Sequence, residues 1–379
     1  MKRILLVIDN IEFGGGERGF LQLVSRLRHR FDFFVAAMPG GPFQQQIEEM
    51  GIPFVPLDVS RRISIKPIGQ MRDFVRGNNI DIIHSQGARV DFFARIAGRM
   101  ANTPHVLSTV QMPIEGFDVG PLRKKLYLLM DRLSGIFVER FIVVSEALKR
   151  LFIEGRRIPA QRVVRIYNGI ELDLYQPNAN QGDLRSKWDI PSRVPLIGAV
   201  GRMVWQKGFE FFLRAIPEIM ESYPDTRFLL VGDGPLRTKL ENLAQQLNID
   251  DSITFTGFQS DIRQILSAID VLVVPSILEG LPMIILEGMA MAKPIVSTHI
   301  DGITEQISDE KEGILVPMRT SKDLAKAVSR LIHDRELAIR LGKAARRRVK
   351  NHFTVEQMIR ETESVYLSLI DTDSQESAR

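Results

Sequence analysis

Short apolar runs alternate with longer amphipathic stretches along the whole chain. In the first half the runs are continuously apolar, which is typical of strands covered on both faces. They lie at residues 4–8, 33–37, 53–59, 81–85, 105–110, 140–145 and 163–167. Helix-length stretches separate them at 17–29, 66–77, 89–101, 122–134 and 145–154. This βαβ repetition predicts a parallel, doubly wound sheet.

The pattern pauses over 172–195, where prolines, asparagines and glycine break the periodicity. It restarts with apolar runs at 195–201, 227–232, 252–257, 271–275, 294–298 and 312–316. We therefore predict an α/β protein with two Rossmann-like domains. Their expected ranges are 1–172 and 195–354, joined by a linker at 173–194. The pattern of the stretch 321–370 predicts helices. We expect the last of them, at about 355–370, to pack back on the first domain. The polar tail 371–379 is expected to be flexible.

Composition removes several classes of protein. A length of 379 residues with 25% charged and 44% apolar residues is ordinary for a globular protein of two or three domains. The absence of cysteine excludes disulfides, thiolate nucleophiles, zinc fingers and iron–sulfur clusters. The apolar run Ile4–Ile8 is too short for a signal peptide, and no stretch is long enough to span a membrane. We expect a cytoplasmic protein.

The charge is unevenly distributed. Residues 1–175 contain 25 Lys and Arg against 18 Asp and Glu, and residues 176–379 contain 25 against 28. A basic first half suggests an anionic partner such as a membrane surface, a nucleic acid or a phosphorylated substrate. Ordinary solvated charge explains an excess of this size equally well.

Three consecutive glycines follow the first predicted strand. Gly14, Gly15 and Gly16 stand directly before Glu17, at the start of an amphipathic stretch. Such glycines allow the backbone to approach a ligand closely, and the helix N-terminus offers free N–H groups to a phosphate. The spacing is not Gly-x-Gly-x-x-Gly, which disfavours an NAD-dependent dehydrogenase. A permissive turn accounts for the glycines equally well.

Two cations occupy the loop after the first strand of the second half. Arg202 and Lys207 lie in the segment Gly201–Gly208, just before a helix, where cations oppose the helix dipole. A bound pyrophosphate would turn this repulsion into attraction, with Arg forking onto phosphate oxygens and Lys acting as a point charge. The local argument favours a phosphate site over a solvated loop.

The segment EGLPMIILE carries two glutamates, Glu279 and Glu287. Pro282 suits the first turn of a helix and leaves the N–H groups of Met283 and Ile284 as an anion site. Glu287 lies in an apolar run, and a buried carboxylate requires hydrogen-bond donors. Ribose hydroxyls could be these donors to Glu287, and Glu279 could accept hydrogen bonds from the hydroxyls of a sugar. A pairing of Glu287 with Lys or Arg across the domain is the open alternative.

Together these elements resemble the retaining glycosyltransferases of family 4, whose GT-B fold consists of two Rossmann-like domains facing a cleft. The resemblance covers most of the chain in order. Further matching segments are DIIHSQG (81–87), VVSEALK (143–149), IYNGIELDLY (166–175), LLVGDGP (229–235) and GITEQI (302–307).

The resemblance implies where the donor binds. The C-terminal domain holds the nucleotide sugar in this family, so Arg202 and Lys207 would hold its diphosphate and Glu287 its ribose. Glu279 and the adjacent backbone would address the donor sugar and phosphates; these backbone residues are Gly280, Leu281, Met283 and Ile284. Loops carrying Gly232, Gly257 and Phe258 would line the base pocket, and Gly14 and Gly15 would close on the diphosphate from the other domain. No metal or cofactor is implied, because the cations and the helix N-terminus would neutralise the leaving diphosphate.

One position departs from the family pattern. Many relatives carry a His after the strand at 105–110, where this chain has Gln111. Gln can donate or accept hydrogen bonds but cannot carry a proton at neutral pH. His84, which matches a frequent family His, is the remaining candidate for a catalytic histidine, and a structural histidine with a satisfied ring is the alternative. The resemblance thus gives Glu279, Arg202, Lys207, His84 and Gln111 as candidate catalytic residues.

A stripe of apolar residues follows three cations near the middle of the first half. Leu122, Leu126, Leu129, Leu133 and Phe137 share one helix face, and Arg123, Lys124 and Lys125 open the segment. Core packing explains such a stripe more often than membrane docking does. In relatives that act on lipid-linked acceptors the N-terminal domain rests on an anionic membrane, so these cations are a candidate membrane contact.

We therefore expect a retaining, metal-independent glycosyltransferase that works in the cytoplasm or on the inner membrane face. It would move a sugar from a nucleoside diphosphate, with UDP favoured over GDP, to a capsule, envelope or lipopolysaccharide-type glycan that is often lipid-linked. Nucleic acid is not an expected partner. The alternatives are a nucleotide-sugar epimerase of the same fold and a non-catalytic module that binds nucleotide or membrane.

Overall fold

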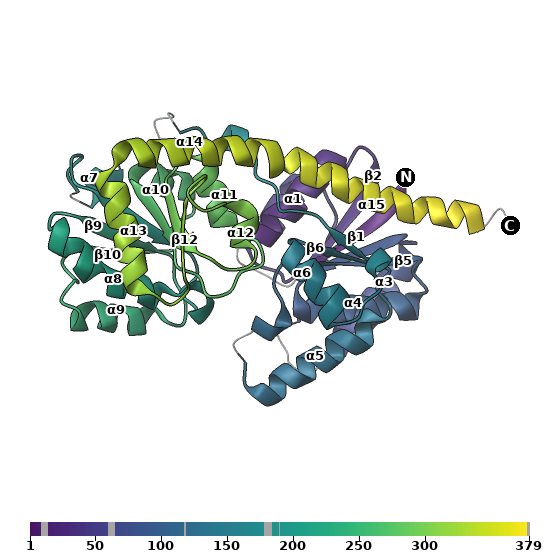
Figure 1. The fold of residues 1–379 in the computed structure, drawn as a ribbon. Coiled ribbons are helices and arrows are strands. Elements are labelled where there is room, and N and C mark those ends of the chain that lie inside the picture. Colours follow the sequence, from purple (N-terminus) through teal and green to yellow (C-terminus); the bar gives the residue numbers. More distant parts are fainter. Residues whose placement is uncertain (9–13, 60–64, 117–118, 178–183, 189, 377–379) are drawn as a thin grey trace. The chain divides into compact units, whose positions relative to one another are not determined.

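A computed structural model describes residues 1–8, 14–59, 65–116, 119–177, 184–188 and 190–376. The chain divides into two compact units (Figure 1). Unit 1 consists of Met1–Gly169 and Val355–Arg379, and unit 2 consists of Ile170–Thr354.

Unit 1 is built on a seven-stranded sheet of order β3-β2-β1-β4-β5-β6-β7, and all of its strand pairs are parallel. Each strand coincides with one of the predicted apolar runs. The strands are β1 (Lys2–Ile8), β2 (Phe31–Ala37), β3 (Phe54–Pro56), β4 (Ile82–Gln86), β5 (His105–Val110), β6 (Arg140–Val143) and β7 (Val163–Arg165).

Helices cover both faces of this sheet, as continuously apolar strands require. Alternate residues of β1 divide between the faces: Ile4 and Leu6 pack with α1, α2 and α15, whereas Leu5 and Val7 pack with α3 and α4. The helices are α1 (Gly15–Leu27), α2 (Pro42–Glu49), α3 (Lys66–Gly77), α4 (Ala88–Ala101), α5 (Pro121–Gly135), α6 (Glu146–Arg150) and α15 (Val355–Glu376). A π-helical turn, Leu151–Gly155, follows α6, and 3-10 turns lie at Ile114–Gly116 and Ala160–Arg162.

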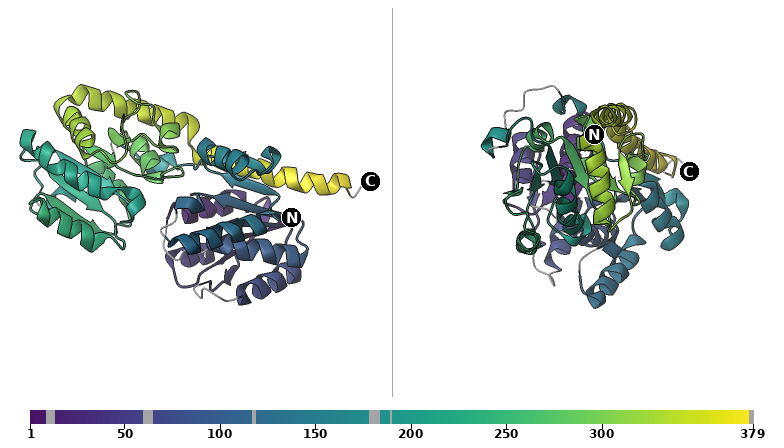
Figure 2. Two further views of the ribbon diagram at one scale, coloured as in Figure 1. Left: turned by 60° about the horizontal axis from the view of Figure 1, so that its bottom comes forward. Right: turned by 60° about the vertical axis from the view of Figure 1, so that its left-hand side comes forward.

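The C-terminal helix α15 belongs to unit 1. Val355, Ile359, Tyr366 and Leu369 are buried in the same apolar cluster as the core face of α1. The yellow end of the chain accordingly lies along the strands and helices of unit 1 in Figures 1 and 2. The helix continues to Glu376, beyond residue 370, where we expected helix to give way to a flexible tail.

Unit 2 contains a six-stranded parallel sheet of order β10-β9-β8-β11-β12-β13. Its strands also follow the predicted runs. They are β8 (Leu196–Val200), β9 (Arg227–Val231), β10 (Ile253–Gly257), β11 (Val271–Val274), β12 (Ile295–Thr298) and β13 (Ile314–Val316).

The helices of unit 2 pack on this sheet according to the alternation of its side chains. Ile197 and Val273 join a core with α8, α9 and α13, while Leu272 lies against Gly288 of α11 on the opposite face. The helices are α7 (Leu184–Lys187), α8 (Phe209–Ser222), α9 (Arg237–Gln246), α10 (Ile262–Ala268), α11 (Met283–Ala290), α12 (Ile303–Gln306), α13 (Ser321–His333) and α14 (Arg335–His352). Short 3-10 turns lie at Leu172–Leu174 and Trp205–Lys207.

The segment 173–194, where the sequence suggests a linker, lies within unit 2. Its described residues pack on that unit: Tyr175 and Ile190 are buried, and Arg185 forms an ion pair of 2.7 Å with Asp270. Prolines and glycine interrupt the helical pattern here without detaching the chain from the unit.

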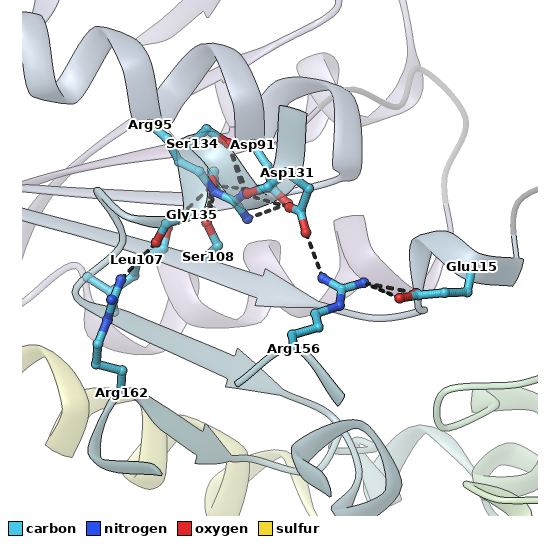
Figure 3. Close-up of polar contacts among 11 residues, drawn as sticks. Asp91, Arg95, Leu107, Ser108, Glu115, Asp131, Ser134, Gly135, Arg156 and Arg162 are labelled. Atoms are coloured by element: carbon cyan, nitrogen blue, oxygen red, sulfur yellow. Dashed lines mark hydrogen bonds and ion pairs between the residues drawn. The ribbon is translucent and has the colours of Figure 1, made fainter. Parts of the chain in front are cut away.

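A buried ionic network holds α5 to the rest of unit 1 (Figure 3). Arg95 of α4 is 1% exposed and lies 2.6 Å from Asp131 of α5 and 3.5 Å from Asp91. Arg156 contacts the other oxygen of Asp131 at 2.6 Å and Glu115 at 2.9 Å. The helix α5 is therefore attached to the rest of unit 1 through its polar face.

The apolar stripe of α5 is exposed, which contradicts the expectation that it belongs to the core. Leu122 is 81% exposed, and Leu126, Leu129 and Leu133 are each more than half exposed. The reason is that the inward face of the helix carries Asp131 and the buried Ser134, which bind Arg95. No described helix has both the length and the apolarity needed to cross a bilayer.

Candidate functional site

Loops at the carboxyl ends of β8, β9 and β11 pack closely in unit 2, which is where ligands bind in open α/β sheets. Two glycines make this packing possible. Gly208 has φ of 61°, and a Cβ there would lie 2.1 Å from the carbonyl oxygen of Pro275. Gly232 has φ of 126°, and a Cβ there would lie 2.0 Å from the carbonyl oxygen of Gly201. Other residues would force these loops apart.

The loop Gly201–Gly208 is fixed by backbone hydrogen bonds. The Met203 amide donates to the Asp233 carbonyl at 2.7 Å, and the Ile277 amide donates to the Gln206 carbonyl at 2.7 Å. The side chain of Arg202 is exposed and makes no hydrogen bond or ion pair with any described residue. A rigid loop thus presents a guanidinium whose donors are available to a ligand.

Lys207 and Glu279 pair with each other, which the sequence alone did not indicate. Lys207 Nζ lies 2.7 Å from Glu279 Oε1, and the hydroxyl of the fully buried Ser276 donates to the same oxygen at 2.7 Å. Glu279 is only 9% exposed, so these two donors replace hydrogen bonds to water that its burial removes. Its Oε2 has no partner within the described part of the chain, and the Lys207 ammonium has donors left over.

Helix α11 begins directly after this pair. Pro282 is its N-cap residue rather than part of its first turn, and the Met283 amide starts the helix. The amides of Met283 and Ile284 have no acceptor among the described residues, whereas the Ile285 amide donates to the Pro282 carbonyl at 3.2 Å. Gly280 and Leu281 lead into this N-terminus and are buried. Its free amides and dipole favour an anion.

Glu287 lies one turn into α11 and is buried. The hydroxyl of Tyr175 donates to its Oε1 at 2.9 Å. Arg346 in turn donates to the Tyr175 carbonyl at 2.8 Å and to the Ala290 carbonyl, which fixes Tyr175 beside α11. Sequence reasoning missed Tyr175 because it lies in the predicted linker; its place at the end of IYNGIELDLY was the available signal.

The loops after β9 and β10 also meet. The Gly232 amide donates to the Gly257 carbonyl at 2.9 Å, and Gly257 has φ of 69°. Phe258 follows and is 68% exposed, an unusual position for a large aromatic ring. Among the candidate donor residues, those of unit 2 therefore lie on adjacent loops at one edge of one sheet and in the first turns of α11.

The candidate residues of unit 1 lie at the carboxyl ends of its own strands. Gln111 donates to Gln86 Oε1 at 3.1 Å and accepts from Asn168 Nδ2 at 2.9 Å. Gly14 caps α1, and its amide donates to the carboxylate of the buried Glu17 at 3.0 Å. Gly15, the first residue of α1, follows directly. Gln111 thus belongs to an amide network at this edge.

His84 is enclosed within unit 1. Its Nδ1 lies 2.6 Å from the Tyr366 hydroxyl and its Nε2 lies 2.7 Å from Thr109 Oγ1, and the ring is 1% exposed. Burial lowers the pKa of this imidazole to about 3, so it is neutral near pH 7. With both nitrogens occupied, His84 has the geometry of the structural alternative rather than of a general base.

The burial of His84 predicts a pH-dependent stability. The unfolded chain protonates this imidazole below its ordinary pKa of 6.5, while the folded chain keeps it neutral down to about 3. The free energy of unfolding is therefore expected to fall as the pH drops from 6.5 towards 3. In His84→Gln this part of the dependence should disappear, as urea unfolding at pH 7.5 and pH 5 would reveal. Replacing the exposed His333 by Gln should leave it unchanged; equal slopes in His84→Gln and wild type would contradict the assignment.

The described residues contain no group of three or more carboxylate or imidazole side chains suited to a metal ion. The charges that could face an anion are instead Arg202, Lys207 and the N-terminus of α11.

Two family models together match nearly the whole chain. The model described as Glycosyltransferase Family 4 matches residues 13–174, and the one described as Glycosyl transferases group 1 matches residues 180–348. The chain belongs to the family 4 glycosyltransferases. It is therefore an enzyme of the glycosyltransferase class, and the resemblance to family 4 glycosyltransferases that the sequence motifs indicated is confirmed.

Individual relatives agree with this assignment. The chain is 27% identical over 353 residues to the UDP-Gal:alpha-D-GlcNAc-diphosphoundecaprenol alpha-1,3-galactosyltransferase of Escherichia coli, covering 90% of each chain. It is 25% identical to the N,N'-diacetylbacillosaminyl-diphospho-undecaprenol alpha-1,3-N-acetylgalactosaminyltransferase of Campylobacter jejuni, covering 86% of this chain and 88% of that protein. Anabaena HepE, solved with UDP-glucose, superposes with a TM-score of 0.85 at 20% identity, covering 97% of this chain and all of the other. This structural likeness confirms the predicted fold class, two Rossmann-like domains of the GT-B type.

Proposed function

We propose that this glycosyltransferase moves a sugar from a UDP-sugar to a lipid-linked envelope glycan and retains the anomeric configuration. The observation that carries the proposal is the convergence of Arg202, Lys207 and the free amides of α11 at one edge of the unit 2 sheet. Positive charge without a metal cluster in the described residues suits a diphosphate leaving group.

Each part of the donor meets a matching chemical group in this proposal. The diphosphate binds Arg202, Lys207 and the amides of Met283 and Ile284. Ribose hydroxyls donate to Glu287, beside Tyr175. The loops of Gly232, Gly257 and Phe258 hold the base, and the exposed phenyl ring of Phe258 offers it a stacking surface.

The reaction proposed for this site is a front-face displacement. The bond between the anomeric carbon and the diphosphate oxygen breaks, and the acceptor hydroxyl oxygen bonds to the same face of that carbon. The proton of the acceptor hydroxyl passes to the leaving phosphate oxygen, so no protein base is needed. This fits Gln111, whose amide is not basic, and His84, which is a weak proton acceptor because burial lowers its pKa to about 3 and both of its ring nitrogens are hydrogen-bonded.

UDP as the donor nucleotide is tested by a thermal-shift comparison. A ligand that binds only the folded state raises its stability by ~2.7 kcal/mol at a concentration one hundred times its Kd. We expect UDP to raise the melting temperature more than GDP, CDP or ADP, and to do so in the presence of EDTA. A larger shift with GDP would contradict the choice of base, and a requirement for Mn²⁺ or Mg²⁺ would contradict the metal-independent site.

The acceptor side is proposed to work at an anionic membrane surface, peripherally and from the cytoplasmic side. Two relatives act, by their names, on sugars linked to undecaprenol through a diphosphate. The exposed leucines of α5 and the cations Arg123, Lys124 and Lys125 give this helix the character of an interfacial helix. Lys124 Nζ also donates to the Glu115 carbonyl at 2.9 Å, so its charge is held close to the helix start.

Vesicle binding tests this contact. Each cation near an anionic surface contributes ~1 kcal/mol, so the protein should cosediment with phosphatidylglycerol vesicles at low salt and not with phosphatidylcholine vesicles. Replacing Arg123, Lys124 and Lys125 by Ser should abolish this binding and leave nucleotide binding intact. The same change at the exposed residues Lys311, Lys322 and Lys326 of unit 2 is the control. Wild-type protein that ignores anionic vesicles would instead indicate a soluble acceptor.

A further inference from the structure

A pocket of about 360 Å³ opens in unit 1 at the edge of the sheet opposite to Gln86 and Gln111. It lies where β5 and β6 begin and where α4 and α5 end, and Thr103, Ile136 and Glu139 are among its lining residues. Its volume is in the range of small-molecule sites. None of the donor or catalytic candidates contributes to it.

Three guanidinium groups line this pocket and retain unused donors. Arg162 Nη2 donates to the Gly135 carbonyl at 2.7 Å (Figure 3), Arg140 Nη1 to a backbone carbonyl at 3.2 Å, and Arg99 Nη1 to Asn102 at 3.4 Å. Arg162 Nη2 also donates to the carbonyls of Ile136, at 3.4 Å, and of Val138. Its Nε and Nη1 groups, and the remaining N–H groups of Arg99 and Arg140, have no hydrogen-bond partner among the described residues. Guanidinium forks of this kind match phosphate oxygens.

The pocket carries more positive than negative charge. Glu139 is the one carboxylate among its described lining residues, and it is already engaged with His105 Nδ1 at 2.7 Å. Burial lowers the pKa of Arg162, and the charge of neighbouring Arg140 lowers it further, against the opposing effect of Glu139. Two like charges held together in this way are stabilised when an anion joins them.

The same pocket borders exposed apolar surface. Ile136 lines it and is 66% exposed, and it directly follows α5, whose leucines are also exposed. A ligand with a phosphate in the pocket would therefore meet hydrocarbon-compatible surface next to it. A free inorganic anion would make no use of that surface.

We propose that this pocket binds the phosphate of an anionic membrane lipid, with the lipid tail leaving along Ile136 and the apolar face of α5. The inference builds on the proposed membrane contact of α5, to which it adds a specific headgroup site at the C-terminal end of the helix. The cations Arg123, Lys124 and Lys125 lie at the other end, so both ends of the exposed stripe are flanked by positive charge.

A short-chain, soluble lipid distinguishes binding in this pocket from general electrostatic attraction of the protein to a membrane. Calorimetry would measure the binding of dihexanoyl phosphatidic acid, below its micelle-forming concentration, against dihexanoyl phosphatidylcholine and inorganic phosphate. Wild-type protein should bind the phosphatidic acid at least about tenfold more tightly than either of the others. Equal binding of inorganic phosphate would overturn the lipid assignment, and equal binding of phosphatidylcholine would overturn the anion site.

Variants locate the binding in the pocket. Arg140→Gln should weaken phosphatidic acid binding by about tenfold, and Arg99→Gln, at an exposed position, provides a second variant without risk to the fold. The control is Arg214→Gln, the same charge change at an exposed position on α8. Unchanged binding in both Arg140→Gln and Arg99→Gln would overturn the proposal.

The proposed membrane contact can fail separately. The triple Ser variant at Arg123, Lys124 and Lys125 should lose vesicle binding and keep its affinity for dihexanoyl phosphatidic acid. Loss of that affinity would show that the lipid binds at the N-terminal end of α5 and would overturn the proposal. If wild-type protein ignored vesicles but bound the soluble lipid through Arg140, the membrane contact would be wrong and the pocket would stand.

Discussion

Replacing Arg202 by Ala is expected to slow sugar transfer by about tenfold or more without lowering the melting temperature. The side chain of Arg202 is exposed and makes no hydrogen bond or ion pair with a described residue, so its loss removes no such interaction of the folded chain. A charge-assisted contact to phosphate contributes ~1.5–3 kcal/mol, and 1.4 kcal/mol corresponds to a factor of ten. Release of nucleoside diphosphate at saturating acceptor, together with thermal melting, measures both quantities.

Lys207→Ala should affect both quantities. It removes a diphosphate contact and also leaves the carboxylate of Glu279, 9% exposed, with Ser276 as its remaining donor among the described residues. Loss of one partner of a buried pair is destabilising, so transfer and melting temperature should fall together. Arg214→Ala, on the exposed face of α8, is the control. Wild-type turnover in both Arg202→Ala and Lys207→Ala would refute the diphosphate site.

Glu279, in the loop before α11, and Glu287, within α11, are expected to have separable effects. Glu287→Gln should weaken the binding of both UDP-sugar and free UDP by about tenfold, because ribose is common to the two ligands and a hydrogen bond to a charged group contributes ~1.5–3 kcal/mol. Glu279→Gln should leave the affinity for free UDP nearly unchanged and slow transfer, because Glu279 is assigned to the sugar. Calorimetry on each variant and a transfer assay distinguish these outcomes.

Tyr175 provides a matched control for this pair. Tyr175→Phe keeps the ring that is buried beside α11 but removes the hydroxyl that donates to Glu287 Oε1. It should weaken free UDP binding less than Glu287→Gln and leave the transfer step unaffected once UDP-sugar is saturating. Equal loss of UDP affinity in Glu279→Gln and Glu287→Gln would contradict the assignment of Glu287 to the ribose and of Glu279 to the transferred sugar.

Much of the fold follows from local pattern. Continuous apolar runs identified the strands of the described residues, because the central strands of a doubly wound sheet are buried on both faces. The motif residues of unit 2 gathered at one edge because parallel strands bring their carboxyl ends together. The sequence therefore placed Arg202, Glu279 and Glu287 near this edge, and their roles in donor binding, which came from the family resemblance, remain predictions.

Other features depend on contacts that no local pattern encodes. The stripe of α5 has the period of a core helix, yet Leu122 is exposed because the opposite face binds the buried Arg95 through Asp131. Tyr175 looks like part of a linker until its hydroxyl is seen to donate to Glu287, more than one hundred residues away. The pairing of Lys207 with Glu279 likewise joins two motifs separated along the chain.

The central claim is that unit 2 holds the nucleoside diphosphate through Arg202 and Glu287. Calorimetric titration of UDP into the wild-type chain and into the double variant Arg202→Ala/Glu287→Gln tests it most directly, with thermal melting to establish that both are folded. We predict one UDP site per wild-type chain and a loss of about a hundredfold in affinity in the folded double variant, as two separate contacts of ~1.5–3 kcal/mol each would give. UDP binding of equal strength in both proteins, or no binding of any nucleoside diphosphate by the wild type, would contradict it.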